Sequence, residues 1–391
     1  MKKIVFTEEF CQPENLFPFT LTRQIQDIRV GIFTIREKWE KALELTSFDK
    51  YEEDYKDLDR SIQLDQSIGD DIIYLVHGNV IPTPRLLKQV KKMKPGEFIS
   101  LEGKESVVYC ISREQVVEPH RIKVQKSVNL KEPPVEIRYP WDLFKVNALA
   151  ITMDFEWVKQ EFRSSKISGT NRLKGSDVFM DKGSSMEHCI INSEEGPVYI
   201  GKNATIMEGS MLRGPVSIGD GAVVKMGTRI YGATTIGPGC IVGGEIKNSI
   251  VFGYSNKAHD GYLGDSIIGE WCNLGAGTSN SNLRNNASPV WVYTPNGPVN
   301  AGLKCGVMMG DYSRTAINTS INTGTVIGVS ANVFGQGLTP KYIPCFSWGS
   351  EGIERYKFEK AKEDIESWKS FKGQSVSEQE KNILKHIFDN F

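Results

Sequence analysis

The sequence predicts an α/β domain, then a parallel β-helix, then a short helical tail. Three observations predict this order. Aliphatic residues recur at every sixth position in the second half, β-branched apolar runs alternate with helical patterns in the first half, and a helix-capping pattern stands near the end. We expect the three parts to span residues 1–165, 175–345 and 350–391. A polar bridge rich in serine and lysine leads from the first part into the second.

The period of six begins at Ile200 and continues without a break to Val242. A small or β-branched residue follows four positions after each aliphatic one. Neither an α-helix nor a series of hairpins repeats every six residues, whereas each flat rung of a parallel β-helix does. The expected inward aliphatic positions are Ile200, Ile206, Leu212, Ile218, Val224, Ile230, Ile236 and Val242, then Leu303, Met309, Thr315, Ile321, Ile327 and Val333. Their expected small partners are Ala204, Ser210, Val216, Ala222, Thr228, Thr234 and Cys240, then Val307, Ser313, Thr319, Thr325 and Ala331.

The first half shows short strand and helix patterns in alternation. Apolar, β-branched runs predict buried strands, and proline near the start of an amphipathic segment predicts a helix. We expect strands at 3–6, 32–35 and 71–76, a helix at 82–93, a strand pair at 98–101 and 107–111, and a helix from 141 to about 156.

Two segments depart from the period of six. Residues 248–261 are expected to interrupt the ladder, and residues 278–302 form a 25-residue excursion rich in asparagine and proline. Such an excursion is either a binding loop or a passive one. Near the end, Ser377 and Glu380 form a capping box. The tail therefore predicts two short helices that pack on the β-helix or on a neighbouring subunit.

Composition excludes several classes of function. Lys plus Arg number 47 and Asp plus Glu 48, so no net charge attracts nucleic acid or an anionic membrane. The seven cysteines form no CxxC pair, so neither a metal site nor a disulfide framework is predicted. No stretch approaches the ~18 apolar residues of a membrane span. The start lacks the apolar run of a signal peptide, and we expect a cytoplasmic protein.

Residues 245–282 combine several motifs at fixed spacing. They are Glu245-Ile246-Lys247, Lys257-Ala258-His259, Tyr262-Leu263-Gly264-Asp265, Ile268-Gly269, Asn273-Leu274-Gly275-Ala276-Gly277-Thr278 and Asn282. With the period of six, this set resembles the GlmU-like family, whose bifunctional members join an N-acetylglucosamine-1-phosphate uridylyltransferase to a glucosamine-1-phosphate acetyltransferase. The resemblance implies a left-handed β-helix, a homotrimer with sites between adjacent copies, and acetyl-CoA as co-substrate.

The resemblance also assigns roles to individual residues. His259 matches the general base that removes a proton from the attacking amine, for which histidine has a suitable pKa. Lys247, Tyr262, Asn273 and Asn282 match residues that bind the sugar phosphate. Each has a plainer alternative: a surface histidine, a solvated lysine, a tyrosine packed on a rung, and corner asparagines. Asp265 is predicted to be a turn residue rather than a second catalytic group.

The first half resembles a divergent branch of sugar nucleotidyltransferases with a Rossmann-like α/β domain, through residues 16–23, 27–31 and 36–39. The resemblance suggests a nucleotide-sugar site at Arg23, Arg29, Asn79 and Asp142, although Asp142 reads equally well as a helix N-cap. The Gly-rich phosphate loop is absent, and Glu8 and Glu9 stand in its place. Asn79 also replaces the usual Mg²⁺-binding aspartate. Nucleotidyl transfer is therefore expected to be impaired, and Mg²⁺ is expected only if that domain is active.

The second half departs from the family after Asn282. Leu283 stands where a tyrosine is usual, residues 286–289 contain no lysine, and the longer excursion carries Trp291 and Tyr293. We therefore expect an acyl-CoA-dependent N-acetyltransferase with an altered acceptor, either an amino-sugar phosphate or a nucleotide sugar. Two alternatives stay open. One is an active sugar-1-phosphate nucleotidyltransferase whose β-helix serves for assembly, and the other is a non-catalytic regulator that binds a nucleotide sugar.

Overall fold

The computed structural model describes residues 2–8, 11–47, 71–101, 106–118, 121–124, 126–130, 132–352 and 354–391. The chain packs into two compact units. The first contains Met1–Pro13, Arg23–Ile28 and Phe33–Arg138, and the second contains Glu14–Thr22, Arg29–Ile32 and Tyr139–Phe391. Packing thus places residues 139–165 with the β-helix, whereas the boundary expected from the sequence lies at residue 165.

The first unit is built on a five-stranded sheet of mixed direction, in the order β1-β4-β7-β6-β10. β1 and β4 are parallel, but β7 runs antiparallel to both of its neighbours. The apolar runs therefore form buried strands as predicted, although not an all-parallel sheet. The strands are β1 (Lys2–Thr7), β4 (Ile72–His77), β6 (Glu97–Leu101), β7 (Ser106–Ile111) and β10 (Lys126–Leu130), with the short pairs β5 (Val80–Ile81) and β11 (Val135–Glu136), and β8 (Val116–Glu118) and β9 (Arg121–Ile122).

Among the described residues, two α-helices accompany this sheet, and one of them corrects a prediction. The expected strand at 32–35 is reduced to β3 (Phe33–Thr34), and helix α1 (Ile35–Leu43) begins at once. The reason is a capping box: the Thr34 hydroxyl accepts from the Glu37 N–H at 3.2 Å, and the Glu37 carboxylate accepts from the Thr34 N–H at 2.6 Å. The predicted helix at 82–93 is confirmed in shorter form as α3 (Pro84–Val90), with Thr83 at its N-cap.

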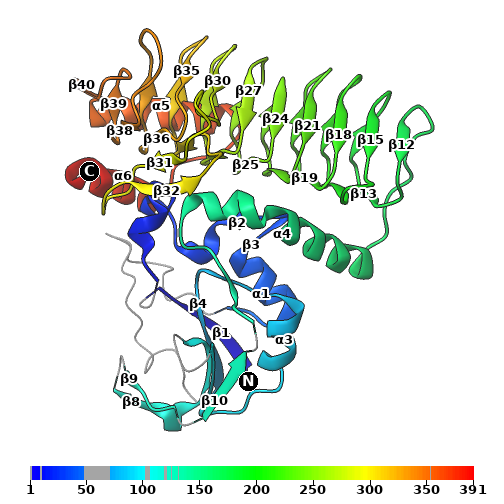
Figure 1. Cartoon of the computed structure of the whole chain (residues 1–391), viewed down its shortest axis with the longest axis vertical. Helices are drawn as coiled ribbons and strands as arrows, with labels where there is room; N and C mark the ends of the chain where they lie inside the picture. Colours follow the sequence, from blue (N-terminus) through cyan, green and yellow to red (C-terminus); the bar gives the residue numbers. More distant parts are fainter. Residues whose placement is uncertain are drawn as a thin grey trace. The chain divides into compact units, whose positions relative to one another are not determined.

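The second unit contains the predicted parallel β-helix, which has three faces (Figure 1). The six-stranded sheet comprises β12 (Arg172–Lys174), β15 (Ile190–Asn192), β18 (Met211–Arg213), β21 (Arg229–Tyr231), β24 (Glu245–Lys247) and β27 (Tyr262–Gly264). The nine-stranded sheet comprises β13 (Val178–Met180), β16 (Val198–Ile200), β19 (Val216–Ile218), β22 (Thr234–Ile236), β25 (Ile250–Val251), β28 (Ile267–Ile268), β33 (Met308–Met309), β36 (Val326–Ile327) and β38 (Tyr342–Ile343). The ten-stranded sheet comprises β14 (Ser185–Met186), β17 (Thr205–Ile206), β20 (Val223–Val224), β23 (Ile241–Val242), β26 (Asn256–Lys257), β29 (Asn273–Leu274), β34 (Arg314–Thr315), β37 (Asn332–Val333), β39 (Ser347–Trp348) and β40 (Glu354–Arg355).

The interior of the β-helix confirms the period of six. Every aliphatic position from Ile200 to Val242, and every small partner from Ala204 to Cys240, is buried. Strands one coil apart pair in register, as in Ile200 with Ile218 and Ile218 with Ile236. The resumed pattern holds from Met309 onward except at the small partner Thr319, which is only half-buried. Leu303 is 58% exposed and does not face the core.

The ladder is not interrupted at residues 248–261, contrary to the prediction. β25 and β26 pair in register with the coils on both sides. What changes is the length of the coil, because Ile241 pairs with Asn256 and Asn256 with Asn273, offsets of 15 and 17 residues. The offset in the preceding coil, from Val223 to Ile241, is 18 residues. Shorter corners move the apolar pattern out of phase without breaking the sheet.

Helix α4 (Pro140–Glu161) covers the nine-stranded sheet (Figure 1). It is held there by Asn147, which is fully buried. The Asn147 amide donates to the Ala233 carbonyl at 2.7 Å and accepts from the Gly31 N–H at 2.7 Å and from the Thr235 hydroxyl at 3.2 Å. Gly31 has a φ of +73°, and a Cβ there would meet the α4 backbone at Ala150 at 2.8 Å. A glycine is therefore required where this segment approaches the helix.

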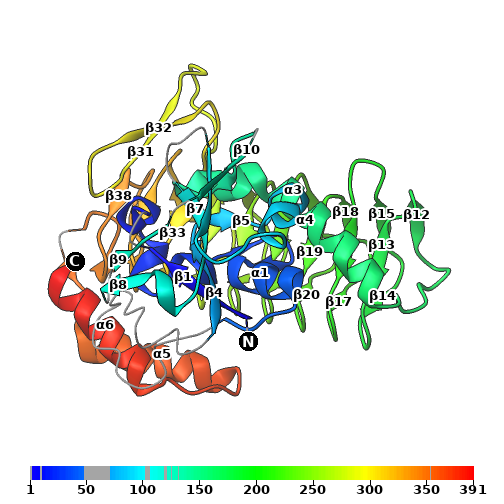
Figure 2. The ribbon, with the colours of Figure 1, turned by 90° about the horizontal axis from the view of Figure 1, so that it is seen from below.

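The excursion and the tail leave the β-helix on different sides (Figure 2). Residues 279–280 still pair in the ladder as β30 (Ser279–Asn280) with β35 (Ser320–Ile321), and the excursion then forms an antiparallel hairpin, β31 (Val290–Val292) and β32 (Val299–Gly302). The predicted tail helices are confirmed as α5 (Phe358–Phe371) and α6 (Glu378–Asn390), with the capping box of Ser377 and Glu380.

The tail packs on the β-helix of its own chain. The Lys372 ammonium donates to the carbonyls of Gly239 and Tyr254 and to the Asn256 side chain, at 2.7–3.0 Å. The Tyr312 hydroxyl bonds the Glu380 carboxylate at 2.9 Å. In the described part of the chain, none of the helices has the length and apolarity needed to cross a bilayer.

Candidate functional site

The six-stranded sheet presents the first group of predicted site residues. On strands β24 and β27, Ile246 and Leu263 are buried in the core, so alternation turns their neighbours outward. Lys247 lies beside Tyr231 of the preceding coil, with its ammonium 5.8 Å from the centre of the Tyr231 ring. This arrangement presents a half-buried cation on the same face as Tyr262.

Asn282 connects the following segment to this face. Its side-chain amide donates to the Tyr262 hydroxyl at 3.1 Å and to the Asp265 carboxylate at 2.5 Å. Asp265 is only 4% exposed and also accepts from the Asn248 amide at 2.6 Å. Burial and the Asp265 charge both raise the pKa of Tyr262. Tyr262 is therefore a neutral hydroxyl at physiological pH, available to donate to a ligand oxygen.

Asp265 has the turn geometry that was predicted, with a φ of +48°. Sequence reasoning missed its further contacts, because it joins Asn248 and Asn282 from two other coils. The signal available was the Gly-Asp pair at a coil corner, which predicts a turn but not a partner. Tyr231 and Glu245 were also missed; they share a hydrogen bond of 2.7 Å that raises the pKa of Tyr231 to about 12.

His259 is exposed at the corner between β26 and β27. The adjacent coils bring backbone rather than bulky side chains close to this corner. A Cβ added at Gly244 would lie 2.9 Å from the His259 carbonyl oxygen, and the Gly277 N–H donates to the Asp260 carbonyl at 3.0 Å. The corner is thus fixed by its backbone while the imidazole remains open to a ligand.

Lys257 supports the same corner from inside the β-helix. It occupies a rung position, paired with Val242 of the preceding coil, and is 2% exposed. Its ammonium donates to the carbonyls of Gly243 at 3.1 Å and His259 at 2.7 Å. Burial lowers the pKa of Lys257 to about 8. Sequence reasoning named Lys257 only as part of the motif.

Asn273 is not part of this group within one chain. It lies on β29 of the ten-stranded sheet, where its side chain accepts from the Asn256 amide at 3.4 Å. Asn256 also receives the Lys372 ammonium from the tail. Within a single chain, Asn273 therefore belongs to an asparagine ladder on another face. It joins the group around Tyr262 only if sites form between copies.

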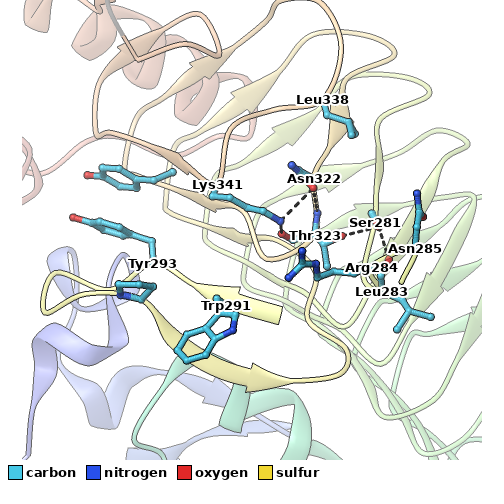
Figure 3. Close-up of a pocket in the computed structure, with 12 residues that line it drawn as sticks. Ser281, Leu283, Arg284, Asn285, Trp291, Tyr293, Asn322, Thr323, Leu338 and Lys341 are labelled. Carbon is cyan, nitrogen blue, oxygen red and sulfur yellow. Dashed lines mark hydrogen bonds between the residues drawn. The ribbon is translucent and has the colours of Figure 1, made fainter. Parts of the chain in front are cut away.

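A pocket of about 600 Å³ opens beside the hairpin (Figure 3). It is lined by Ser281 and Leu283, which flank Asn282, and by Trp291 and Tyr293 of the hairpin. The excursion predicted as a possible binding loop thus forms one wall of a cavity. Two further lining residues, Arg284 and Lys341, escaped the sequence analysis. The family pattern has a lysine in this segment, and Arg284 does not match it. Lys341 lies almost sixty residues farther along the chain.

The first unit holds Arg23 and Asn79, and the surroundings of Asn79 differ from those of a phosphate and metal site. Buried Glu8 follows β1, and its carboxylate accepts from the Ile25 N–H at 2.5 Å, so an internal anion already occupies this backbone donor. Asn79 is buried, and its Oδ1 lies 3.3 Å from the Cys11 sulfur, which donates to it. Burial raises the pKa of Cys11 to about 12, so this thiol stays protonated. Arg23 is half-buried.

These residues fit a Mg²⁺ ion poorly. The one oxygen that Asn79 offers already accepts a hydrogen bond, and the described residues contain no group of three His, Cys, Asp or Glu side chains able to hold a metal. Glu9, the second carboxylate named from the sequence, lies outside the described residues.

Arg29 and Asp142 lie in the second unit. The Arg29 guanidinium donates to the Ile32 carbonyl. Asp142 is the third residue of α4, and its carboxylate accepts from the Tyr139 N–H at 2.9 Å. Asp142 therefore caps the helix from its first turn, while Tyr139 occupies the N-cap position itself. The four residues proposed for the nucleotide-sugar site are divided between the two units.

Comparisons with known proteins agree with this two-part architecture. Residues 4–163 match the model of the sugar nucleotidyl transferase family, and residues 197–232 match the bacterial transferase hexapeptide repeats. The bifunctional protein GlmU of Methanocaldococcus jannaschii is 42% identical over 84 residues, which are 22% of this chain and 21% of that protein. A bifunctional sugar-1-phosphate nucleotidylyltransferase/acetyltransferase of Sulfurisphaera tokodaii is 37% identical over 91 residues, 23% of each chain.

A third relative is matched over more of its own length. The uncharacterised acetyltransferase YaiX of Escherichia coli is 33% identical over 161 residues, which are 40% of this chain and 70% of that protein. The chain spans less than a quarter of the length of the two archaeal relatives that it matches. The two matched family models cover the same two parts that the structure contains. The chain belongs to the GlmU-like family, in which a sugar nucleotidyltransferase domain is combined with bacterial transferase hexapeptide repeats.

Proposed function

We propose that the chain is an acyl-CoA-dependent N-acetyltransferase that acts on an amino-sugar phosphate or a nucleotide sugar. One observation carries this proposal: Asn282, Tyr262 and Asp265 form a hydrogen-bonded group on the face that also carries Lys247. Tyr262 follows the exposed His259 by three residues in the chain. The group offers a cation, a neutral hydroxyl and a fixed amide within one region, and these suit a phosphorylated sugar.

The proposed reaction transfers an acetyl group from sulfur to nitrogen. His259 accepts the proton of the acceptor amine as its nitrogen attacks the thioester carbonyl, and the carbon–sulfur bond then breaks to release CoA. A base with a pKa near neutrality suits this step because the amine must lose a proton before the product amide forms. Lys247, Tyr262 and Asn282 bind the acceptor so that its amine faces this base.

We further propose that the working form is a homotrimer with sites between adjacent copies. The position of Asn273 supports this, because the residue lies on a face other than that of Tyr262. In such an assembly Asn273 of one copy meets Tyr262 of the next. Light scattering should then report about three times the chain mass of 43.8 kDa, and a monomer would remove the shared site.

For the first unit we propose impaired nucleotidyl transfer. The Glu8 carboxylate on the Ile25 N–H and the engaged Asn79 both argue against a phosphate cradle with Mg²⁺. The second candidate function is an active sugar-1-phosphate nucleotidyltransferase, which is favoured by the family match over residues 4–163. Pyrophosphate release from UTP or dTTP with a sugar 1-phosphate distinguishes the two, because robust turnover would establish the second.

The main proposal is tested by release of CoA thiol from acetyl-CoA over a panel of amino-sugar phosphates and nucleotide sugars. Loss of a general base lowers kcat by ~10²–10⁴-fold. His259→Ala should therefore lose most of kcat with KM and melting temperature nearly unchanged, because His259 is exposed. The matched control is His386→Ala, another exposed histidine, on α6. Equal rates for wild type and His259→Ala would remove His259 from the mechanism.

A further inference from the structure

The pocket beside hairpin β31–β32 adjoins the proposed acceptor site without being part of it. Asn282 donates to Tyr262 and Asp265, whereas Ser281 and Leu283 on either side of it line the pocket. Consecutive residues thus lead from one site into the other. The wall of the pocket therefore includes both chain neighbours of Asn282, one of the residues proposed to bind the sugar.

The pocket carries two cations that lack anionic partners. Arg284 donates to the Pro289 carbonyl, and Lys341 donates to the Asn322 side chain and to the Thr323 carbonyl. Neither cation is paired with a carboxylate in the part of the chain that the structure describes, and no acidic residue lines the pocket. Two unpaired cations on one cavity wall repel each other, and an anionic ligand removes that repulsion. The electrostatic effect of Arg284 is one cause, after burial, of the lowered pKa of Lys341.

The opposite wall presents an aromatic ring. The hairpin strand alternates buried Val290, exposed Trp291 and buried Val292, which turns the indole of Trp291 outward with 53% of its surface exposed. The strand is anchored next to this position because the rings of Tyr293 and Tyr342 stack at 3.9 Å with an angle of 13° between them. Figure 3 shows Trp291 on the hairpin strand and Arg284, Lys341 and Asn322 across the cavity from it.

We propose that this pocket binds the nucleoside diphosphate part of a nucleotide-linked amino sugar. Arg284 and Lys341 bind the two phosphates, Trp291 stacks on the base, and the sugar reaches Asn282 and Tyr262. The inference rests on the proposed acetyltransferase function and specifies its acceptor class. It also accounts for the departures from the family after Asn282, because the missing lysine and tyrosine are replaced by a cation pair and an aromatic ring at other positions.

The shape and chemistry of the pocket favour this ligand over a sugar phosphate. A sugar phosphate has one phosphate and no planar ring, so it leaves Trp291 and one of the two cations without a contact. A volume of about 600 Å³ lies within the range of small-molecule and cofactor pockets, ~300–1,000 Å³. CoA shares the nucleotide and phosphate chemistry, and it is separated from a nucleotide sugar by direct binding measurements.

The test is isothermal calorimetry on the full chain with four probes: UDP, UDP-N-acetylglucosamine, glucosamine 1-phosphate and CoA. The variants are Arg284→Gln with Lys341→Gln, and Trp291→Ala. A charged hydrogen bond or a stacked base each contributes about tenfold or more to affinity. We expect the double variant to lose one bound UDP or UDP-sugar per chain, and Trp291→Ala to weaken both by about tenfold. Trp291→Phe should retain most of the affinity.

Two matched control variants distinguish loss of the pocket residues from a general effect of altered charge or a removed aromatic ring. Lys182→Gln removes an exposed lysine from a distant corner of the β-helix, and Phe371→Ala removes an aromatic ring that is 81% exposed on α5. Neither should change binding of any probe. Counting bound molecules separates the pocket from any nucleotide site in the first unit, because only the pocket is altered by the variants.

The outcomes are distinguishable from failure of the acetyltransferase proposal. An unchanged number and affinity of bound UDP in all variants, or no binding of UDP by the wild type, would overturn the pocket assignment even if acetyl transfer to a sugar phosphate were observed. A loss confined to CoA would assign the pocket to the co-substrate and overturn the acceptor assignment. Loss of UDP binding in the variants, with no acetyl transfer by the wild type, would keep the nucleotide pocket and reject the proposed reaction.

Discussion

The side-chain amide of Asn282 donates a hydrogen bond of 3.1 Å to the hydroxyl of Tyr262, twenty residues earlier in the chain. Because the same amide donates to Asp265, it has two acceptors that hold it in one orientation. Because Tyr262 accepts from Asn282, its own proton stays available to another acceptor. Tyr262 and Asn282 lie in separate coils, and this hydrogen bond joins them into one binding element.

The first prediction follows from that coupling. Tyr262→Phe and Asn282→Ala should each lower kcat/KM for the acceptor, and the double variant should lose little more than either single one, because each change already breaks the shared element. The measurement is a double-mutant cycle on kcat/KM, with circular dichroism to verify the fold. Strictly additive losses would show that the two residues act independently.

The sequence predicted the β-helix well because its period of six depends on local geometry. Each rung repeats the same inward aliphatic and small pair, so the pattern can be read without knowing which coils are neighbours. It failed at 248–261 because the corners there are shorter, and at Leu303 because this residue directly follows the hairpin strand β32 and does not lie on a rung. A coil of 15 residues has the same rungs as a coil of 18, but its corners shift the pattern out of phase.

The candidate site was less predictable because its contacts join residues far apart in the chain. The family resemblance supplied Tyr262 and Asn282, and the structure adds Asp265, which bonds Asn248 and Asn282. Arg284 and Lys341 share a cavity only because the excursion folds back onto a later coil. No spacing rule brings such residues together. At 32–35, a local capping box overrode strand propensity, and this signal was readable in the sequence as Thr34 and Glu37.

The second prediction concerns the buried Lys257. In the folded chain its pKa is lowered to about 8, whereas the unfolded chain has the ordinary value of 10.5. Between these values the unfolded state binds more protons, so this group adds stability as pH rises from about 8 to about 10.5 and costs stability below that window. Lys257→Met removes this dependence. Urea unfolding of both proteins at pH 7.5 and pH 9.5 should show that the free energy of unfolding of the wild type, relative to that of the variant, is larger at the higher pH.

Lys257→Met should also affect the His259 corner. The ammonium no longer bonds the carbonyls of Gly243 and His259, so the corner loses its internal support. We expect kcat to fall while the melting temperature at pH 7 changes little, because loss of the two hydrogen bonds offsets relief of the buried charge. The control is Lys225→Met, at an outward position two coils earlier. An unchanged kcat would mean that Lys257 has no part in positioning His259.

The third prediction concerns acid stability of the first unit. Burial lowers the pKa of His77 to about 4, from 6.5 when unfolded. As pH falls from about 6.5 to about 4, His77 becomes protonated in the unfolded state but stays neutral in the folded state. The free energy of unfolding therefore falls by up to ~3 kcal/mol. His77→Phe should lose less stability between pH 7 and pH 5 than the wild type does, measured by urea midpoints of the full chain. Parallel losses in both proteins would assign the acid sensitivity to other groups.

The last prediction concerns the attachment of α4 to the β-helix. Asn147 is fully buried, and its amide serves the Ala233 carbonyl, the Gly31 N–H and the Thr235 hydroxyl. Asn147→Ala leaves the Ala233 carbonyl and the Gly31 N–H without that partner, whereas the Thr235 hydroxyl keeps the Gly31 carbonyl at 3.0 Å. Each unsatisfied buried group costs ~1–3 kcal/mol. We therefore expect a loss of several kcal/mol in the free energy of unfolding, together with faster proteolysis of the 139–165 region. Lys145→Ala, on the exposed side of the same helix, should cost less than ~0.5 kcal/mol. Equal losses in the two variants would mean that general packing of α4, rather than the Asn147 network, holds the helix in place.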